Sequence, residues 1–235
     1  MEKQEEIPFV AMAELRVGII GLGRMGWLHA EHLSGAIRGA RFVAAAVDEA
    51  HRKLLEKAGG APWPLVTGAE ALIADPAIDA IVIVSPTSAH HEHIIMAAER
   101  GKAIFAEKPL ADSVDHARAA AEAVRRAGVP FQIGFQRRFD PGYARAKALI
   151  DEGAIGTPEM FRGLTCDRMP PVEYLRTSGG LFWDLGIHDF DAARFLMGDD
   201  IAAVHATGSI IIEPALAEFD DVDHGIATLR FQRGG

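Results

Sequence analysis

Short apolar runs alternate with stretches of helical spacing along the first half of the chain. The runs have the length and apolar character of strands that are buried on both faces, and they lie at 15–20, 41–47, near 65, and at 81–84, 102–106 and 129–134. Helices are expected between them at 27–33, 51–57, 69–73 and 91–100, and in the alanine-rich run that ends before Gly128. This alternation predicts a parallel sheet with helices on both faces, a doubly wound α/β domain over residues 14–134.

The pattern changes after residue 134, where a second domain is predicted over residues 135–235. Strands are expected at 157–165, 203–212 and 225–232. Helices are expected at 143–150 and around Asp184 and His188, where Tyr174 leads into a helix that ends at Gly198. Residues 1–13 are interpreted as a leader that precedes the first strand.

Composition narrows the class of protein. The 235 residues carry a formal charge of −9, which argues against nucleic-acid or anionic-membrane partners. The single cysteine, Cys166, excludes an intramolecular disulfide and a multi-cysteine zinc site. No run approaches the length of a membrane span and no signal-peptide pattern is present, so a cytoplasmic location is expected.

A glycine-rich turn follows the first expected strand and precedes a helix. Its spacing, with Gly21, Gly23 and Gly26, is typical of a dinucleotide site: a tight turn, close approach of backbone to a pyrophosphate, and close helix–strand packing. Asp48 ends the second strand, where a carboxylate binds ribose hydroxyls and repels a 2′-phosphate, which favours NAD over NADP. The alternative is a simple glycine turn with a solvated aspartate. The predicted cofactor-binding residues here are Gly21, Gly23, Arg24, Met25, Gly26 and Asp48.

Two further segments lie at carboxyl ends of buried strands, where open α/β sheets bind ligands. They add Ser85, Pro86, Thr87, His90, Glu107 and Lys108 to the predicted cofactor-binding set. The Lys108 ammonium there can hydrogen-bond a substrate hydroxyl, although a Glu–Lys surface pair explains the spacing equally well. A metal at His90, His91 and His93 is not favoured, because no second ligand cluster with zinc spacing accompanies them. No metal is predicted.

Asp184 and His188 stand four residues apart in a run of helical spacing, so they are expected on one face of a helix. Gly179 and Gly180 precede them and allow close approach of backbone or ligand. Such a pair is either a solvated surface pair or a base with its orienting carboxylate. The arginine pairs at 125–126 and 137–138 are interpreted as solvated or domain-contact charges.

Together these motifs resemble the Gfo/Idh/MocA oxidoreductases, and most of all their inositol 2-dehydrogenase branch. The resemblance runs from about Leu15 to the C-terminus and rests on Gly21–Gly26, Pro86–His90, Glu107–Pro109, Gly134–Phe139, Ser178–Gly180 and the Asp184/His188 pair. It implies an N-terminal Rossmann domain and a C-terminal α+β domain with an open, mostly antiparallel sheet. It also implies a homo-oligomer, a dimer or tetramer, built through that sheet. Family members are usually longer, so the second domain is expected to be incomplete.

The same resemblance implies NAD(P)-dependent oxidation of a polyol or sugar hydroxyl, with NAD preferred here. It makes His188 the general base, Asp184 its orienting group and Lys108 the ligand of the reacting oxygen, and it places Tyr174 with them in the substrate site. It also implies a cis Lys108–Pro109 bond. The loop 167–170 departs from the inositol-type pattern, which leaves the substrate open. Two alternatives stay open: a cofactor-binding regulator without turnover, and an enzyme that eliminates or transfers a group through transient oxidation.

Overall fold

The computed structural model describes residues 14–235, and the expected leader at 1–13 lies outside them. The described chain divides into two compact units, 14–132 and 133–235. This division falls two residues before the expected boundary at 134.

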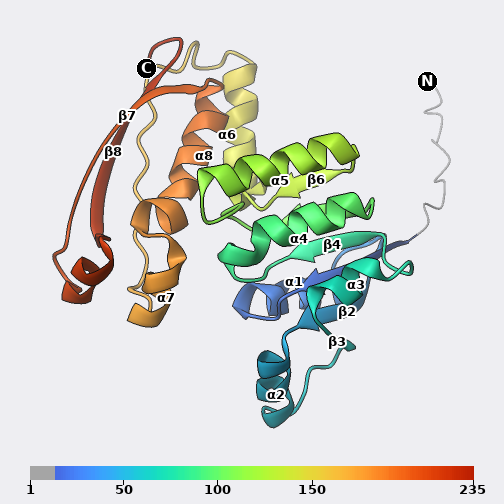
Figure 1. Ribbon diagram of the computed structural model, residues 1–235. Coiled ribbons are helices and arrows are strands. Elements are labelled where there is room, and N and C mark those ends of the chain that lie inside the picture. The colour runs from blue at the N-terminus through green and yellow to red at the C-terminus, as the bar shows by residue number, and fades with distance from the viewer. Residues whose placement is uncertain (1–13) are drawn as a thin grey trace, which may run out of the picture. The chain divides into compact units, whose positions relative to one another are not determined.

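The first unit is built on a six-stranded sheet (Figure 1). Its strands are β1 (Leu15–Ile20), β2 (Ala40–Val47), β3 (Leu65–Thr67), β4 (Ala80–Ile83), β5 (Ala103–Ala106) and β6 (Phe131–Ile133). The strand order is β3-β2-β1-β4-β5-β6, and β1 pairs in parallel with both β2 and β4. This is the doubly wound order of a Rossmann sheet, so the predicted fold class is confirmed for this unit.

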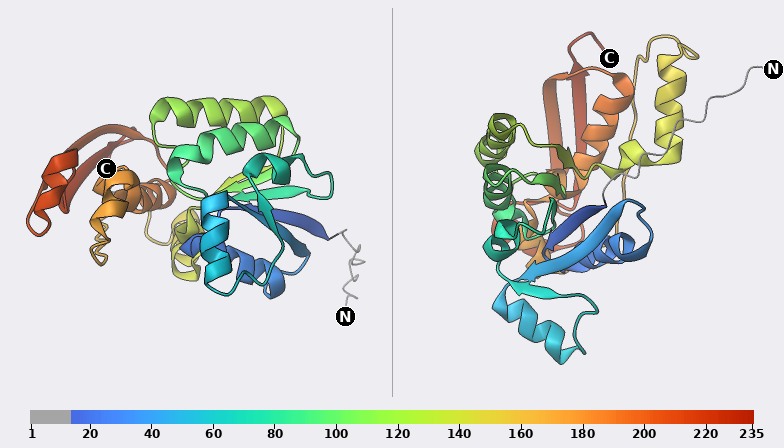
Figure 2. Two further views of the ribbon diagram at one scale, coloured as in Figure 1. Left: turned by 60° about the horizontal axis from the view of Figure 1, so that its bottom comes forward. Right: turned by 90° about the vertical axis from the view of Figure 1, so that its right-hand side faces the viewer.

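Helices cover both faces of this sheet, as Figure 2 shows. They are α1 (Arg24–Gly35), α2 (Glu49–Lys57), α3 (Ala69–Ala74), α4 (Thr87–Glu99) and α5 (Val114–Ala127). One apolar cluster packs α3, α4 and α5 on the sheet through Leu72, Ile73, Ile94, Ala97, Ala98 and Ala120. A second cluster packs α1 on the other face through Ala30 and Leu33. Within residues 14–235, no helix has the length and apolar character to cross a membrane.

The second unit combines helices with a two-stranded antiparallel ribbon. Its elements are η1 (Gln136–Phe139), α6 (Pro141–Asp151), α7 (Val172–Ser178), the π-helical turn η2 (Phe182–Gly186), α8 (Ile187–Met197), β7 (Ile201–Ser209), η3 (Pro214–Phe219) and β8 (His224–Phe231). Strands β7 and β8 pair with each other, and Phe231 of β8 packs on Ala193 and Met197 of α8. An α+β unit with an antiparallel sheet was the prediction, and it is confirmed.

Two predictions about strands in the second unit are wrong. Residues 157–165 form no strand, because the second sheet of the described chain holds only β7 and β8 and neither pairs with this segment. Strand β7 ends at Ser209 instead of residue 212. There the backbone N–H groups of Ile211 and Ile212 donate to the Asp223 carboxylate, so they are satisfied by a side chain and not by a neighbouring strand.

A break separates α7, which contains Tyr174, from the helical run that carries Asp184 and His188. Helix α7 ends at Ser178, where Gly179 and Gly180 both take positive φ angles, 88° and 93°. A right-handed helix cannot continue through two such residues. The chain resumes helical structure only at Leu181, through the π-helical turn η2 into α8.

The packing of α1 on its own loop gives a first prediction. A methyl group at Gly26 would lie 2.0 Å from the Gly21 carbonyl oxygen, whereas one at Gly35, in the same helix, would meet nothing within 4 Å. We expect Gly26→Ala to lower the free energy of unfolding by about 3 kcal/mol or more, because the obstructing atom is backbone. The control Gly35→Ala should raise it by about 0.5–1 kcal/mol through helix propensity. Urea denaturation followed by circular dichroism measures both, and equal stability of the two variants would contradict the packing.

Candidate functional site

In the loop between β1 and α1, two of the three glycines lie too close to neighbouring backbone atoms to carry a side chain. Gly21 has φ 98°, and a methyl group there would lie 2.6 Å from the Val84 carbonyl oxygen. Gly26 faces the Gly21 carbonyl as described above. A methyl group at Gly23 would meet nothing within 4 Å, so it would extend into open space in front of the loop. This is the arrangement that lets a pyrophosphate approach the backbone closely.

Helix α1 starts directly from this loop. Its N-cap is Gly23, which supplies no side-chain hydrogen bond to the first turn. The predicted cofactor ligands Arg24 and Met25 are the first two residues of the helix, Arg24 exposed and Met25 half-buried. Free N–H groups and the positive end of the helix dipole suit a phosphate at this position. The residues present therefore fit the phosphates of a dinucleotide.

Asp48 lies where the sequence predicts it, immediately after β2. Its carboxylate accepts a hydrogen bond from the backbone N–H of His51 (2.7 Å) and so caps α2. Capping alone accounts for an aspartate at this position. The ribose contact consequently stays a prediction.

The segment after β4 is fixed by two histidines of α4. Ser85 Oγ and His93 Nδ1 are 2.9 Å apart. His90 is 2% exposed, and its two ring nitrogens lie 2.8 Å from the Ser85 carbonyl oxygen and 2.7 Å from that of Pro109. One imidazole thus joins the segment after β4 to the segment after β5. Helix α4 itself begins at Thr87, earlier than expected, with Pro86 as its N-cap.

The protonation of His90 is set by two opposing effects. Burial lowers the pKa of His90, while the two carbonyls and the nearby Glu107 carboxylate favour the charged form and oppose that shift. Burial outweighs them, so the pKa lies below its ordinary value. A neutral imidazole donates from one nitrogen, so it serves one of the two carbonyls at a time. Burial also lowers the pKa of His93.

The segment after β5 contains Glu107, Lys108 and Pro109. The Glu107 carboxylate lies 2.8 Å from His29 Nε2 of α1 and also accepts the Lys108 backbone N–H at 3.3 Å. The Lys108–Pro109 peptide bond is cis, as the resemblance implied. His29 was missed in the sequence, where an isolated histidine on a helix gives no signal of a distant carboxylate partner. The segments after β1, β4 and β5 are thus held at carboxyl ends of adjacent strands, where this fold binds ligands.

The predicted catalytic residues of the second unit lie on the π-helical turn and on the start of α8. Tyr174 Oη of α7 donates to Asp184 Oδ2 at 2.7 Å, so the predicted substrate residue Tyr174 and Asp184 are brought together. Asp184 lies inside η2, and His188 is in the first turn of α8; both are half-buried. Single π-helical turns inside helices are frequent at functional sites. The sequence spacing gave no sign of this turn.

The double glycine before this turn is tightly enclosed. A methyl group at Gly179 would lie 2.8 Å from Trp183 Cδ1, and one at Gly180 would lie 2.8 Å from Asp221 Oδ1. The same Asp221 oxygen accepts the Leu181 backbone N–H at 2.9 Å, at the start of the helical turn. Asp221 therefore positions the segment that carries Asp184, although it lies far along the chain and the sequence did not single it out.

Two arginines were misinterpreted from the sequence. Arg137 and Arg138 are not simply solvated charges: they form ion pairs within their own unit, with Asp189 (2.5 Å) and Asp191 (2.6 Å) of α8. Asp191 is 5% exposed, and the hydrogen bond to it raises the pKa of Arg138. These pairs fix the start of α8, where His188 lies, against η1.

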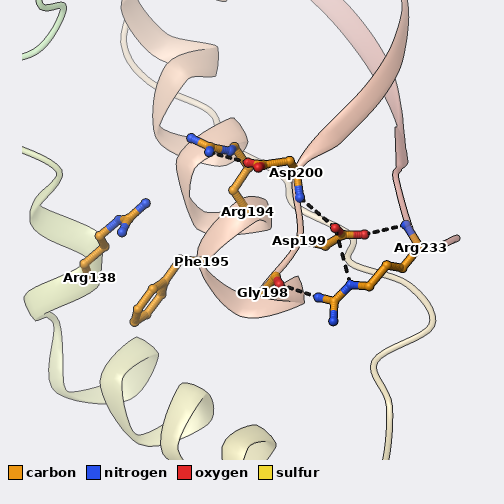
Figure 3. A pocket seen from close by; sticks show the side chains of 7 residues that line it. All are labelled: Arg138, Arg194, Phe195, Gly198, Asp199, Asp200 and Arg233. Atoms are coloured by element: carbon orange, nitrogen blue, oxygen red, sulfur yellow. Dashed lines mark hydrogen bonds and ion pairs between the residues drawn. The ribbon is translucent and has the colours of Figure 1, made fainter. Parts of the chain in front are cut away.

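A pocket of about 380 Å³ lies elsewhere in the second unit (Figure 3). Four of its charged residues pair with one another, Arg194 with Asp200 (2.5 Å) and Arg233 with Asp199 (3.4 Å), and the fifth, Arg138, pairs with Asp191. None of the predicted site residues lines it. Charges that are satisfied internally leave little attraction for a ligand, so this pocket is a weaker candidate than the strand ends described above.

Comparison with known proteins agrees with this geometry. A family model described as "Oxidoreductase family, NAD-binding Rossmann fold" matches residues 15–135, and one for the GFO/IDH/MocA C-terminal domain matches residues 143–235. The chain belongs to the Gfo/Idh/MocA oxidoreductase family. Among other members, the chain is 42% identical over 229 residues to a scyllo-inositol 2-dehydrogenase (NAD(+)) of Bacillus subtilis, covering 94% of this chain and 65% of that protein.

Two further comparisons also identify inositol dehydrogenases as relatives of this chain. An inositol 2-dehydrogenase of Rhizobium meliloti is 40% identical over 210 residues, covering 89% of this chain and 63% of that protein. The crystal structure of scyllo-inositol dehydrogenase from Lactobacillus casei, with bound NAD(H) and scyllo-inositol, superposes with a TM-score of 0.80 at 32% identity, covering 93% of this chain and 66% of that one. The chain thus spans about 65% of the length of such relatives.

The buried histidines of α4 predict a pH dependence of stability. Because burial lowers the pKa of His90 and His93, the unfolded state binds protons first as the pH falls below about 6.5. The free energy of unfolding should therefore decrease as the pH falls from about 6.5 through the folded-state pKa values, by at most about 1.4 kcal/mol per pH unit for each proton. Urea denaturation between about pH 7.5 and 5 measures this slope.

Two variants separate this contribution from the rest of the protein. His90→Gln should reduce the slope, because glutamine does not titrate. His32→Gln, on the exposed side of α1, should leave it unchanged. An unchanged slope in His90→Gln would contradict the assignment.

Proposed function

We propose that this protein is an NAD-dependent dehydrogenase that oxidises a secondary hydroxyl of an inositol-like polyol or sugar. The observation that carries the proposal is the hydrogen bond from Tyr174 to Asp184 on the π-helical turn that leads to His188. It makes a surface-pair explanation of Asp184 and His188 less favourable, because a fixed and half-buried carboxylate is what a general base requires as its orienting group.

The first unit supplies the proposed cofactor site. Gly21, Gly23 and Gly26 let the pyrophosphate approach the backbone closely, and the first turn of α1 binds the phosphates. The Asp48 carboxylate accepts hydrogen bonds from the ribose hydroxyls. When bound, NAD supplies the hydride acceptor. The remaining predicted cofactor contacts are Arg24, Met25, Ser85, Pro86, Thr87, His90, Glu107 and Lys108.

The proton chemistry is assigned to side chains of this chain. His188 takes the proton of the substrate hydroxyl, since an imidazole works as a base near neutral pH. Asp184 orients that imidazole and favours its charged form, and Tyr174 holds Asp184 in place. Lys108, on the segment that His29 and His90 anchor, is assigned to the reacting oxygen.

The substrate class comes from the relatives. The names of the Bacillus and Rhizobium proteins specify inositols, and the Lactobacillus structure holds scyllo-inositol. A homo-oligomer that uses the antiparallel sheet of the second unit is part of the same proposal.

The test is NADH formation, followed by absorbance, with NAD and scyllo-inositol, myo-inositol, aldoses or uronates as substrates. We expect turnover with an inositol. His188→Ala should reduce kcat by about 10²–10⁴-fold, the usual contribution of a general base, with NAD affinity within twofold of the parent. His32→Ala, at an exposed histidine in the last turn of α1, is the control and should retain full activity.

The outcomes separate the alternatives. NAD binding by calorimetry without NADH formation on any substrate would overturn the dehydrogenase and leave the two alternatives, a regulator that only binds the cofactor and an enzyme that returns the hydride after transient oxidation. Full activity of His188→Ala would end the assignment of the base while leaving the reaction class in place.

Asp48 gives a second test, on cofactor choice. Because Asp48 also caps α2, Asp48→Ser is the sharper variant: serine keeps a capping oxygen and removes the charge. We expect NAD affinity to fall about tenfold, the loss of roughly one charge-assisted hydrogen bond, with relatively tighter NADP binding. Calorimetric titration with both cofactors measures this. Unchanged NAD affinity at unchanged thermal stability would remove Asp48 from the ribose site.

A further inference from the structure

Three potential metal ligands meet where α4 lies beside the start of α5, in the first unit. His91 is in the second turn of α4, Asp112 precedes α5, and His116 is in the first turn of α5. Each offers one ligand atom, and these three atoms all lie within 4.8 Å of one another. Figure 1 shows α4 and α5 running side by side here.

The local geometry fixes two of these residues. Ser113 caps α5 by accepting the backbone N–H of His116 at 3.2 Å, and Asp112 Oδ1 lies 2.6 Å from His116 Nδ1. An anionic oxygen and an imidazole nitrogen are therefore presented together from one short segment.

The surroundings of His91 differ from those of a residue in an ordinary surface ion pair. Its ring stacks on that of His116, with centroids 3.9 Å apart and planes 9° from parallel. Its Nδ1 is buried and has no hydrogen-bond partner among the described residues. A buried nitrogen without a partner is costly, and bound water or an ion is a usual explanation.

The neighbouring histidines are occupied, which singles out His91. His90 contacts the carbonyls of Ser85 and Pro109, and His93 contacts Ser85 Oγ. The sequence disfavours a metal at these three histidines because no second ligand cluster with zinc spacing accompanies them. In the fold, Asp112 just before α5 and His116 in its first turn lie close to His91.

We propose that His91, Asp112 and His116 bind a divalent transition metal ion, with Zn²⁺ as the best fit. Two imidazole nitrogens and one carboxylate oxygen are a donor set for Zn²⁺, Co²⁺ or Ni²⁺, whereas Ca²⁺ and Mg²⁺ prefer oxygen alone. Because Asp112 and His116 are exposed, water completes the tetrahedron. The site ties α4 to the segment that leads from Lys108 into α5, and it is independent of the proposed dehydrogenase activity.

Closing the site needs a small local change. Ligands about 2.0–2.2 Å from zinc stand roughly 3.4 Å from one another in a tetrahedron, so atoms that are now up to 4.8 Å apart need to approach by at most about 1.4 Å. Two parallel stacked rings do not aim their lone pairs at one point. The exposed His116 ring therefore rotates, and its hydrogen bond to Asp112 is exchanged for two bonds to the metal.

The charges around the site permit a cation to replace the hydrogen bond between His116 and Asp112. The N-terminal turn of α5 carries a positive partial charge that opposes a cation. The carboxylates of Asp112 and Asp115, both at this end of the helix, offset it.

The test uses metal-free protein without an affinity tag, in a Cys166→Ser background so that the exposed thiol does not compete. Calorimetry with ZnCl₂ should give one site per chain. Saturating Zn²⁺ should raise the melting temperature by several degrees, since a ligand bound to the folded state stabilises it. CoCl₂ should give the visible absorption bands of tetrahedral Co²⁺.

Matched variants distinguish this site from non-specific binding. His91→Ala, His116→Ala and Asp112→Asn should each weaken Zn²⁺ binding at least tenfold and remove the cobalt bands. His224→Ala is the control, because His224 is an equally exposed histidine paired with an aspartate, Asp223, in the second unit (2.7 Å). Circular dichroism melts without metal check that each variant folds. Zn²⁺ affinity within twofold of the parent in folded His91→Ala and His116→Ala would overturn the proposal.

Discussion

The close contact between Gly26 and the Gly21 carbonyl is the constraint on which the first unit depends. It brings α1 against the end of β1, at the point where the order of the sheet reverses between β1 and β4. Gly21 in turn fits under the Val84 carbonyl at the end of β4. The position of the helix N-terminus, and with it the phosphate site, therefore follows from backbone packing and not from any polar side chain.

The segments after β4 and β5 are fixed by a different means. Histidines on the helices reach the loops: His90 contacts two carbonyls, His93 contacts Ser85, and His29 contacts Glu107. These contacts give partners to polar groups that lie in buried or partly buried positions, although a neutral His90 serves only one of its two carbonyls at a time. Three histidines thus serve to shape the loops. Lys108 lies on the segment that these contacts hold.

The first unit was largely predictable because its signals are local. Strands buried on both faces are continuous apolar runs, and the glycine spacing reports backbone constraints directly, so both the parallel sheet and the loop could be expected. Pairing between distant side chains gives no such local signal. Glu107 and Leu181 lie in motifs that the sequence analysis names, but nothing in the sequence indicates that their partners are His29 and Asp221. The predicted strand at 157–165 was wrong for a related reason. A strand forms only when another strand pairs with it, and the sequence of the segment does not show whether a partner strand is present.

The acidic residues around His188 show why spacing alone was insufficient in the second unit. Asp184, Asp189 and Asp191 look alike in the sequence, yet each has a different partner. Asp189 and Asp191 bind Arg137 and Arg138, whose positive charges balance them and fix α8 to η1. Asp184 accepts from Tyr174, a phenol that donates a hydrogen bond without adding a positive charge. Asp189 and Asp191 are thus each paired with an arginine, whereas Asp184 lies on the π-helical turn and accepts from a phenol. These partners, together with the four-residue spacing, support the proposed assignment of Asp184 to His188.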